Sequence, residues 1–147
     1  MSKMVFRRTK LDELKPGEFR LFAKTLSDTD AMLYAGISGE MSPLYLNESF
    51  AAETALKTRT VHPMLVAALC GGAIYRLLSP AVQTISREFH FLLPVYAGDT
   101  ITACAEVREV YSGEGRVVLD ISCYNQREEK VMEGTSSEVL MVPDQEV

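Results

Sequence analysis

The chain has 147 residues, a length that suits one domain with its own hydrophobic core. Hydrophobic residues make up 47% and charged residues 24% of the sequence, which are ordinary values for a soluble globular protein. The net charge is −5 and the basic residues are scattered, so no nucleic-acid surface is expected and a phosphate-rich ligand would need a local basic spot.

Segment composition and cysteine usage indicate a cytoplasmic protein. No apolar run approaches the ~20 residues of a membrane span, and the basic segment 1–10 lacks the apolar stretch of a secretory signal. Cys70, Cys104 and Cys123 lie far apart in apolar surroundings, which favours buried free thiols in a reducing compartment. We therefore expect no membrane contact and, with two histidines in the chain, no metal site.

The first predicted elements are a strand and a capped helix. Residues 19–25 alternate apolar and polar side chains, which predicts the strand. Ser27 and Asp30 have the spacing of a capping box, so a helix is predicted to begin there and to end at Gly36 or Gly39.

A loop over 39–47 and a second short helix over 48–56 are predicted next, because Asn47 is a favoured helix N-cap. The loop reads Gly-Glu-Met-Ser-Pro-Leu-Tyr-Leu-Asn and has the features of a catalytic loop whose reactive side chains have been exchanged. A short linker over 58–62 leads to the next element.

A long apolar helix is predicted over 63–78. Pro63 suits the first helical position, and Ser79-Pro80 is a sound stop. The segment is apolar nearly all round, which suggests a helix wrapped on several sides by a sheet. Its small residues, among them Gly71 and Gly72, would let another element approach closely.

The remainder predicts consecutive strands joined by short turns, at 84–93, 99–111, 116–125 and 131–142. One long buried helix followed by such hairpins indicates an α+β hot-dog, in which a curled antiparallel sheet wraps a central helix. The sequence shows no repeat or linker, so we expect a single domain over 1–147 with its core at about 19–142. An open sheet leaves an edge strand exposed, and dimerisation commonly covers it.

Several of these segments resemble the MaoC-like, (R)-specific enoyl-CoA hydratase family, over roughly 19–142. The matching pieces are the helix at 30–39, Ser42-Pro43-Leu44, His62 with Met64-Leu65, and the most specific one, Phe-His-Phe-Leu-Leu-Pro-Val-Tyr-Ala-Gly-Asp-Thr at 89–100. The resemblance implies a hot-dog dimer with acyl-CoA sites near the dimer interface.

In that family the loop follows the pattern G-D-x-N-P-x-H, and its Asp and His activate a water that adds across an enoyl thioester. The present chain carries Glu40 for the Asp, Ser42 for the Asn and Tyr45 for the His. Family members usually read H-G-M at the start of the long helix, where the Gly N–H donates to the thioester carbonyl. Here the sequence is His62-Pro63-Met64.

Each exchange changes the chemistry that is available. Glu40 keeps a carboxylate but extends it by one methylene, and a general base must come within hydrogen-bond reach. Tyr45 has a reference pKa of about 10 against about 6.5 for His, so a neutral phenol donates a hydrogen bond or acts as an acid but is a poor base. Pro63 has no N–H, and loss of an oxyanion donor costs about 2.7–4 kcal/mol in other enzymes. The Met64 N–H would replace it only if the backbone shifts.

The candidate catalytic residues are therefore Glu40 as base, Tyr45 as proton donor or water-positioning group, and Ser42 as a donor to the thioester. The candidate substrate-binding residues are His62, Pro63 and Met64. Simpler interpretations stay open for most of them. Glu40 could be a solvated loop acid and Tyr45 an aromatic side chain that only fills space. Ser42 could be a turn residue and His62 a structural histidine. A triad of Ser42, His62 and an acid is a weak further option.

Three functions are compatible with these residues. The first is a hydratase- or dehydratase-type lyase acting on acyl-CoA, with no other cofactor. The second is an inactive acyl-CoA binder, either a homodimer or the partner subunit of an active hot-dog chain in a hetero-oligomer. The third is an acyl-CoA thioesterase that uses Glu40. Arg59, Arg76 and Arg87 are candidate partners for the CoA phosphates, since Arg binds phosphate in a bidentate way.

Overall fold

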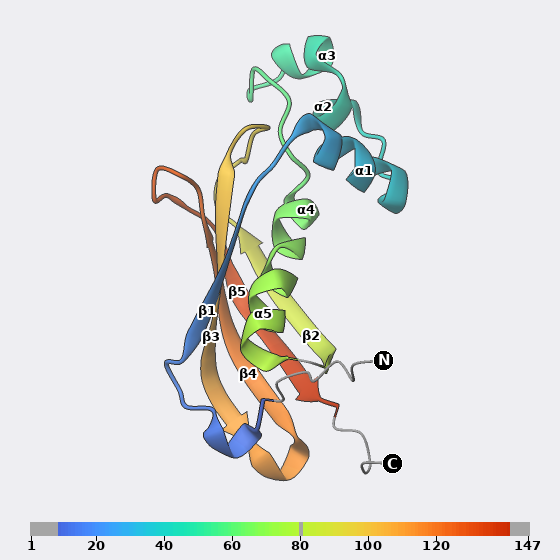
Figure 1. The fold of residues 1–147 in the computed structure, drawn as a ribbon. Coiled ribbons are helices and arrows are strands. Elements are labelled where there is room, and N and C mark those ends of the chain that lie inside the picture. The colour runs from blue at the N-terminus through green and yellow to red at the C-terminus, as the bar shows by residue number, and fades with distance from the viewer. Residues whose placement is uncertain (1–8, 80, 142–147) are drawn as a thin grey trace, which may run out of the picture.

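The computed structural model describes residues 9–79 and 81–141, and its centre is one antiparallel sheet (Figure 1). The strands are β1 (Phe19–Thr25), β2 (Val82–Phe91), β3 (Thr100–Tyr111), β4 (Arg116–Tyr124) and β5 (Lys130–Leu140). They lie in the order β1-β3-β4-β5-β2, and every neighbouring pair is antiparallel. Strands β1 and β2 are therefore the two edges.

Helices lie on the inner side of the sheet and beyond one end of it (Figure 1). The helical elements are η1 (Leu11–Glu13), α1 (Asp28–Ser38), α2 (Pro43–Leu46), α3 (Glu48–Ala52), α4 (Pro63–Ala68), α5 (Cys70–Leu78) and η2 (Ser112–Glu114). Helix α5 packs on β1, β3 and β4, while α1, α2 and α3 overhang the end of the sheet. This arrangement confirms the predicted α+β hot-dog. Among the described residues, no helix is both long and apolar enough to cross a bilayer.

Alternation along the central strands builds the core. On β4, Val117, Leu119, Ile121 and Cys123 are buried, while the residues between them are half-buried on the other face. The sequence predicted this alternation because successive side chains of a strand point to opposite faces. Cys70 and Cys123 are buried as expected, and burial raises the pKa of the Cys123 thiol to about 12. The expectation was wrong for Cys104, which is only partly buried.

The predicted helix over 63–78 is interrupted at Leu69, which separates α4 from α5. Around this residue the backbone bonds span three residues instead of four: the Leu69 N–H donates to the Val66 carbonyl at 3.1 Å, and the Gly72 N–H to the Leu69 carbonyl at 3.1 Å. Tightening of this kind keeps Leu69 in a helical conformation but breaks the regular α-helical ladder. The two helices still follow one another through the middle of the fold (Figure 1).

The first predicted helix is confirmed in detail. The Asp30 N–H donates to Ser27 Oγ at 3.1 Å, and the Asp30 carboxylate accepts from the Ser27 N–H at 2.9 Å, which completes the capping box. The helix ends at Gly39, whose φ of +76° lies in the left-handed region that glycine adopts without strain.

Two local predictions were wrong in the following segment. Residues 43–46 form a short helix, α2, instead of a loop, because Ser42 caps it and Pro43 occupies its first position. Helix α3 is capped by Asn47 as predicted but ends at Ala52 rather than at position 56. Thr54 causes this early end, since its hydroxyl donates to the Ala51 carbonyl at 2.7 Å and accepts from the Leu56 N–H at 3.2 Å.

Neighbouring glycines of α5 give a matched test of the helix–sheet contact. A Cβ at Gly72 would lie 2.5 Å from the Phe22 ring of β1, whereas a Cβ at Gly71 would meet nothing within 4 Å. We expect Gly72→Ala to lower the free energy of unfolding by about 1–3 kcal/mol through overpacking. Gly71→Ala should raise it by about 0.5–1 kcal/mol, the usual gain of Ala over Gly inside a helix. Urea unfolding measures both, and equal effects of the two variants would contradict the close approach of Phe22.

Candidate functional site

An apolar pocket of about 300 Å³ lies between α2, the start of α4 and the segment after β2. Leu44, Val66, Phe91 and Val131 are among its apolar lining residues, and its polar lining residues are Tyr45 and Thr60. Such a site suits a ligand with an apolar body and a polar group at one end.

Three aromatic rings meet beside this pocket. His62, the N-cap residue of α4, lies between Tyr34 of α1 and Tyr45 of α2, with ring centroids 4.8 Å apart in both pairs. Val61 and Pro63, on either side of His62 in the chain, line the pocket, as does Tyr45. The fold thus brings together three helices that the sequence separates, and it places the rings at the pocket's edge.

Tyr45 is a protonated phenol at neutral pH. Burial raises its pKa above the ordinary value of 10.0, and the nearby acidic groups of Glu40 and Tyr34 raise it further. Glu40 itself is exposed just beyond Gly39, and its backbone N–H donates to Ser38 Oγ at 3.1 Å. A phenol whose pKa is raised in this way can serve as an acid, and a nearby carboxylate can serve as a base.

Ser42 and Met64 have structural roles in the described fold. Ser42 Oγ accepts from the Leu44 N–H at 3.4 Å and caps α2. The Met64 N–H donates to His62 Nδ1 at 3.0 Å, and the Leu65 N–H donates to the His62 carbonyl at 2.9 Å. Since Pro63 has no N–H, the first turn of α4 offers no backbone donor to a ligand. The Met64 N–H, which the sequence left open as a replacement, is already engaged.

An ionic clamp holds the overhang against the linker that leads to His62, and sequence reasoning did not find it. Arg59 donates to Asp28 at the start of α1 at 2.9 Å and to Glu48 of α3 at 3.2 Å. Glu48 also accepts from the Thr58 hydroxyl at 2.7 Å. Arg59 lies 31 residues from Asp28 and 11 residues from Glu48 in the chain, so no local sequence pattern predicts these contacts.

The arginines proposed for the CoA phosphates are engaged within the protein. Arg59 belongs to the clamp, and Arg76 donates to the Gly72 carbonyl at 2.9 Å. Arg87 donates to Ser136 at 3.0 Å and to the buried Glu138 at 3.2 Å. Each of these arginines thus has at least one partner within the protein.

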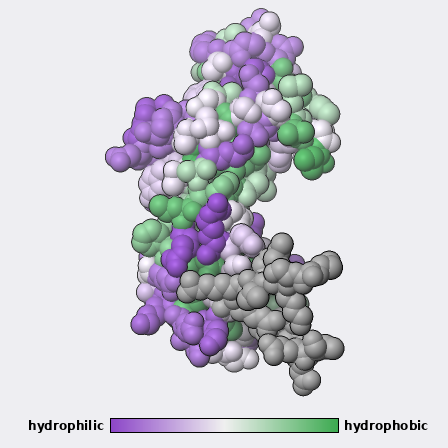
Figure 2. All heavy atoms as spheres, viewed as in Figure 1, coloured by the Kyte–Doolittle hydropathy of each residue, from purple (hydrophilic) through white to green (hydrophobic). Residues whose placement is uncertain are grey.

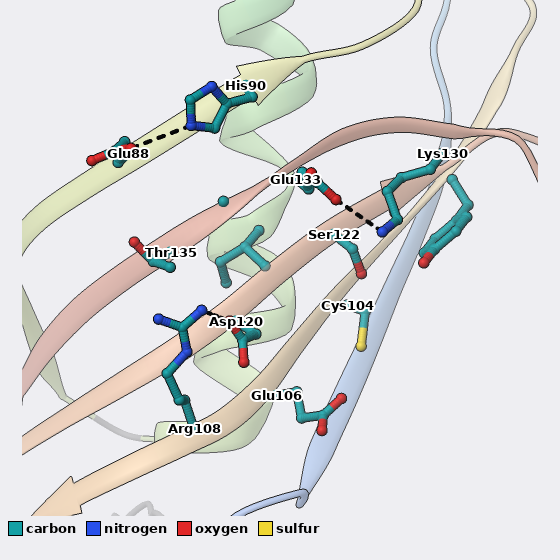
Figure 3. A pocket seen from close by; sticks show the side chains of 13 residues that line it. Glu88, His90, Cys104, Glu106, Arg108, Asp120, Ser122, Lys130, Glu133 and Thr135 are labelled. Atoms are coloured by element: carbon teal, nitrogen blue, oxygen red, sulfur yellow. Dashed lines mark hydrogen bonds and ion pairs between the residues drawn. The ribbon is translucent and has the colours of Figure 1, made fainter.

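A larger hollow, of about 380 Å³, lies on the outer face of the sheet (Figure 3). Most of its ionisable side chains pair with one another: Glu88 with His90 at 3.2 Å, Glu133 with Lys130 at 2.9 Å, and Asp120 with Arg108, while Glu106 makes no ion pair with another described residue. Exposed pairs of this kind are typical of a solvated surface. The apolar pocket beside His62 is accordingly the candidate site.

The overhang also exposes apolar side chains. Met32, Leu33 and Ile37 of α1 are 66%, 58% and 85% exposed, and apolar residues are visible at the upper right of Figure 2, where α1 lies. Exposed apolar clusters of this kind commonly mark an interaction surface.

Comparisons with known proteins find matches to one family. A family model described as MaoC like domain matches residues 14–125. An (R)-specific enoyl-CoA hydratase of Rhodospirillum rubrum is 33% identical over 76% of this chain and 78% of its own length. A 3-hydroxybutyryl-CoA dehydratase of Methylorubrum extorquens is 31% identical over 92% of this chain and 85% of its own. The structure of an (R)-hydratase from Aeromonas caviae superposes with a TM-score of 0.84 at 27% identity, covering 88% of this chain and 98% of that one.

The clamp predicts a pH-dependent contribution to stability. Hydrogen bonds from the Thr58 hydroxyl and the Arg59 backbone hold the pKa of Glu48 below its ordinary value of 4.5. Its contribution is therefore present above about pH 4.5 and is lost as the pH falls through the lowered folded-state pKa. We expect Glu48→Gln to have a lower Tm than the wild type at neutral pH and the difference to vanish in acid.

The matched control is Glu53→Gln, which changes a carboxylate of the same segment that makes no side-chain hydrogen bond among the described residues. Its Tm difference from the wild type should not vary with pH. A Glu48→Gln difference that stays constant from neutral to acidic pH would contradict the clamp.

Proposed function

The chain belongs to the MaoC-like domain family, and from that premise we propose that it is a hydratase or dehydratase of acyl-CoA thioesters. The observation that carries this proposal is the position of Tyr45. Its side chain lines the apolar pocket, and the nearby Glu40 contributes to its raised pKa. A phenol that lines a pocket with apolar walls, with a carboxylate near enough to raise its pKa, matches a substrate whose reacting group adjoins an apolar chain.

In the dehydration direction, Glu40 takes the proton from the carbon next to the thioester carbonyl. Tyr45 gives its phenolic proton to the departing hydroxyl, so that water leaves and a double bond forms. After each dehydration the proton returns from Glu40 to Tyr45 through solvent. Hydration is the reverse, so Tyr45 takes the proton of water, Glu40 gives its proton to the carbon, and the proton then returns from Tyr45 to Glu40. The raised pKa of Tyr45 keeps its proton in place at neutral pH, which is the state that dehydration requires.

The pocket supports binding of the acyl chain. Leu44, Val66, Phe91 and Val131 provide apolar walls, and a tail placed among them would leave the thioester near Tyr45 and His62. Burial of the tail contributes roughly 0.8 kcal/mol per methylene, which favours an acyl group over a small polar substrate.

A second candidate is an acyl-CoA binder without activity, and one observation favours it. The first turn of α4 offers no backbone N–H to the thioester oxygen, because Pro63 lacks one and the Met64 N–H is bonded to His62. The exposed apolar side chains of α1 would suit a second subunit, either another copy in a homodimer or an active hot-dog chain in a hetero-oligomer. No specific observation favours the thioesterase that would use Glu40. Ser42, the nucleophile of the weaker triad option, serves as a helix cap.

Hydration of crotonyl-CoA, followed as loss of enoyl-thioester absorbance, tests the proposal. The wild-type protein should turn over, and Glu40→Gln and Tyr45→Phe should each lower kcat by roughly 100-fold or more, the usual cost of losing a general acid or base. Tyr45→Phe keeps the ring beside His62, and Glu53→Gln, in the same overhang, should leave the rate unchanged. Absence of turnover together with retained butyryl-CoA binding would favour the inactive binder.

The pH profile gives an independent readout of Tyr45. Burial raises its pKa above the ordinary value of 10.0, so the phenol carries its proton at neutral pH. In dehydration of 3-hydroxybutyryl-CoA, where Tyr45 is the acid, we expect no alkaline loss of kcat below about pH 10, the reference value for Tyr. A fall of activity near neutral pH that Tyr45→Phe abolishes would show that this phenol titrates elsewhere and would contradict its assigned role.

A further inference from the structure

Removal of a proton beside a thioester carbonyl places negative charge on the carbonyl oxygen. Hydrogen-bond donors aimed at such an oxygen commonly provide the largest single stabilisation of the transition state. If the proposed reaction occurs, the donor must come from a group other than the first turn of α4, whose N–H groups are missing at Pro63 and engaged at Met64.

The hydrogen bond that occupies Met64 also sets the protonation of His62. Because His62 Nδ1 accepts the Met64 N–H at 3.0 Å, Nδ1 carries no proton, and the neutral ring carries its proton on Nε2. The Nε2–H makes no hydrogen bond within residues 9–79 and 81–141. His62 is half-buried, and no buried side-chain nitrogen or oxygen of the described residues lacks a partner, so Nε2 is open to solvent or to a ligand.

The ring is held in place from several sides. Tyr34 and Tyr45 contact it at 4.8 Å between ring centroids, and the cap bond to Met64 fixes its rotation. The residues before and after it, Val61 and Pro63, line the apolar pocket. A donor that is fixed before the ligand arrives needs little reorganisation when charge develops.

We propose that the Nε2–H of His62 donates a hydrogen bond to the thioester carbonyl oxygen and replaces the backbone donor that Pro63 removes. This inference rests on the proposed function. It makes His62 a catalytic residue that stabilises the oxyanion without transferring a proton. Thr60 is the competing donor, since it lines the same pocket and its hydroxyl makes no hydrogen bond to another described residue.

Two substitutions separate the two roles of His62. In His62→Asn the side-chain oxygen can still accept the Met64 N–H, because Asn is a favoured N-cap, but no donor remains at the position of Nε2. In His62→Gln the longer side chain carries an N–H to about the position of Nε2, while the cap is lost. Thr60→Val removes the competing donor, and circular dichroism verifies that each variant is folded.

The decisive measurement is the infrared carbonyl band of butyryl-CoA labelled with ¹³C at the thioester carbon, a ligand that cannot react. In the wild-type protein the band should shift to lower frequency on binding. The shift should be lost in His62→Asn and retained in His62→Gln and Thr60→Val. With crotonyl-CoA, His62→Asn should lower kcat by about 100-fold or more, the cost of losing one oxyanion donor.

A shift that persists in His62→Asn, or one that disappears only in Thr60→Val, overturns the role of His62 and leaves the proposed function standing. A shift that depends on His62 without any turnover of crotonyl-CoA supports the donor and contradicts the reaction. Failure of the wild-type protein to bind butyryl-CoA overturns both.

Discussion

The hydrogen bond from the Met64 N–H to His62 Nδ1 governs the chemistry available at this site. It caps α4, whose second residue would otherwise leave an N–H without a partner. It also removes that N–H from the set of ligand donors and leaves the imidazole proton on Nε2. Pro63 reduces the number of backbone donors at this helix start further, since its ring fixes the first helical residue and carries no N–H. One short contact thus decides which groups can reach a ligand.

The rest of the site depends on how firmly the overhang is held over α4. Helices α1 to α3 lie beyond the end of the sheet, where the core that stabilises β3, β4 and α5 does not reach (Figure 1). Arg59 links α1, α3 and the linker through Asp28 and Glu48, and the rings of Tyr34 and Tyr45 pack on His62. Partly exposed ion pairs are individually weak, so the clamp and the rings act together to keep the pocket in shape.

The exchange of reactive groups has a consistent physical pattern. A phenol in a half-buried position with a raised pKa keeps its proton at neutral pH, so Tyr45 rests as an acid, while Glu40 lies on the exposed loop that leads to it. An imidazole at position 62, with its proton directed by the helix cap, adds a neutral donor to this pair. Acid and base would therefore come from the segment 39–47 and the donor from the start of α4.

The local sequence was enough to predict most of the helices and strands. The Ser27–Asp30 box, the Asn47 cap, the alternation of β4 and the helix-starting Pro63 each depend on neighbours within a few residues, and each was predicted. The motif around Glu40 and Tyr45 also predicted a site, and in the structure Tyr45 lines the apolar pocket. The same reasoning missed the end of α3, where the Thr54 side chain competes with the regular helix. It also missed the break at Leu69, where backbone bonds that span three residues replace those that span four.

Only the tertiary structure decided which groups are free. The pairing of Arg59 with Asp28, of Arg87 with Glu138, and of His62 with two tyrosines joins residues that are far apart in the chain. A sequence records that an arginine or an amide exists, but its availability depends on partners that the fold brings within hydrogen-bond distance. For that reason only the assembled fold shows which donors already have a partner and which are open to a ligand. This holds for the three arginines, the Met64 N–H and the Nε2–H of His62.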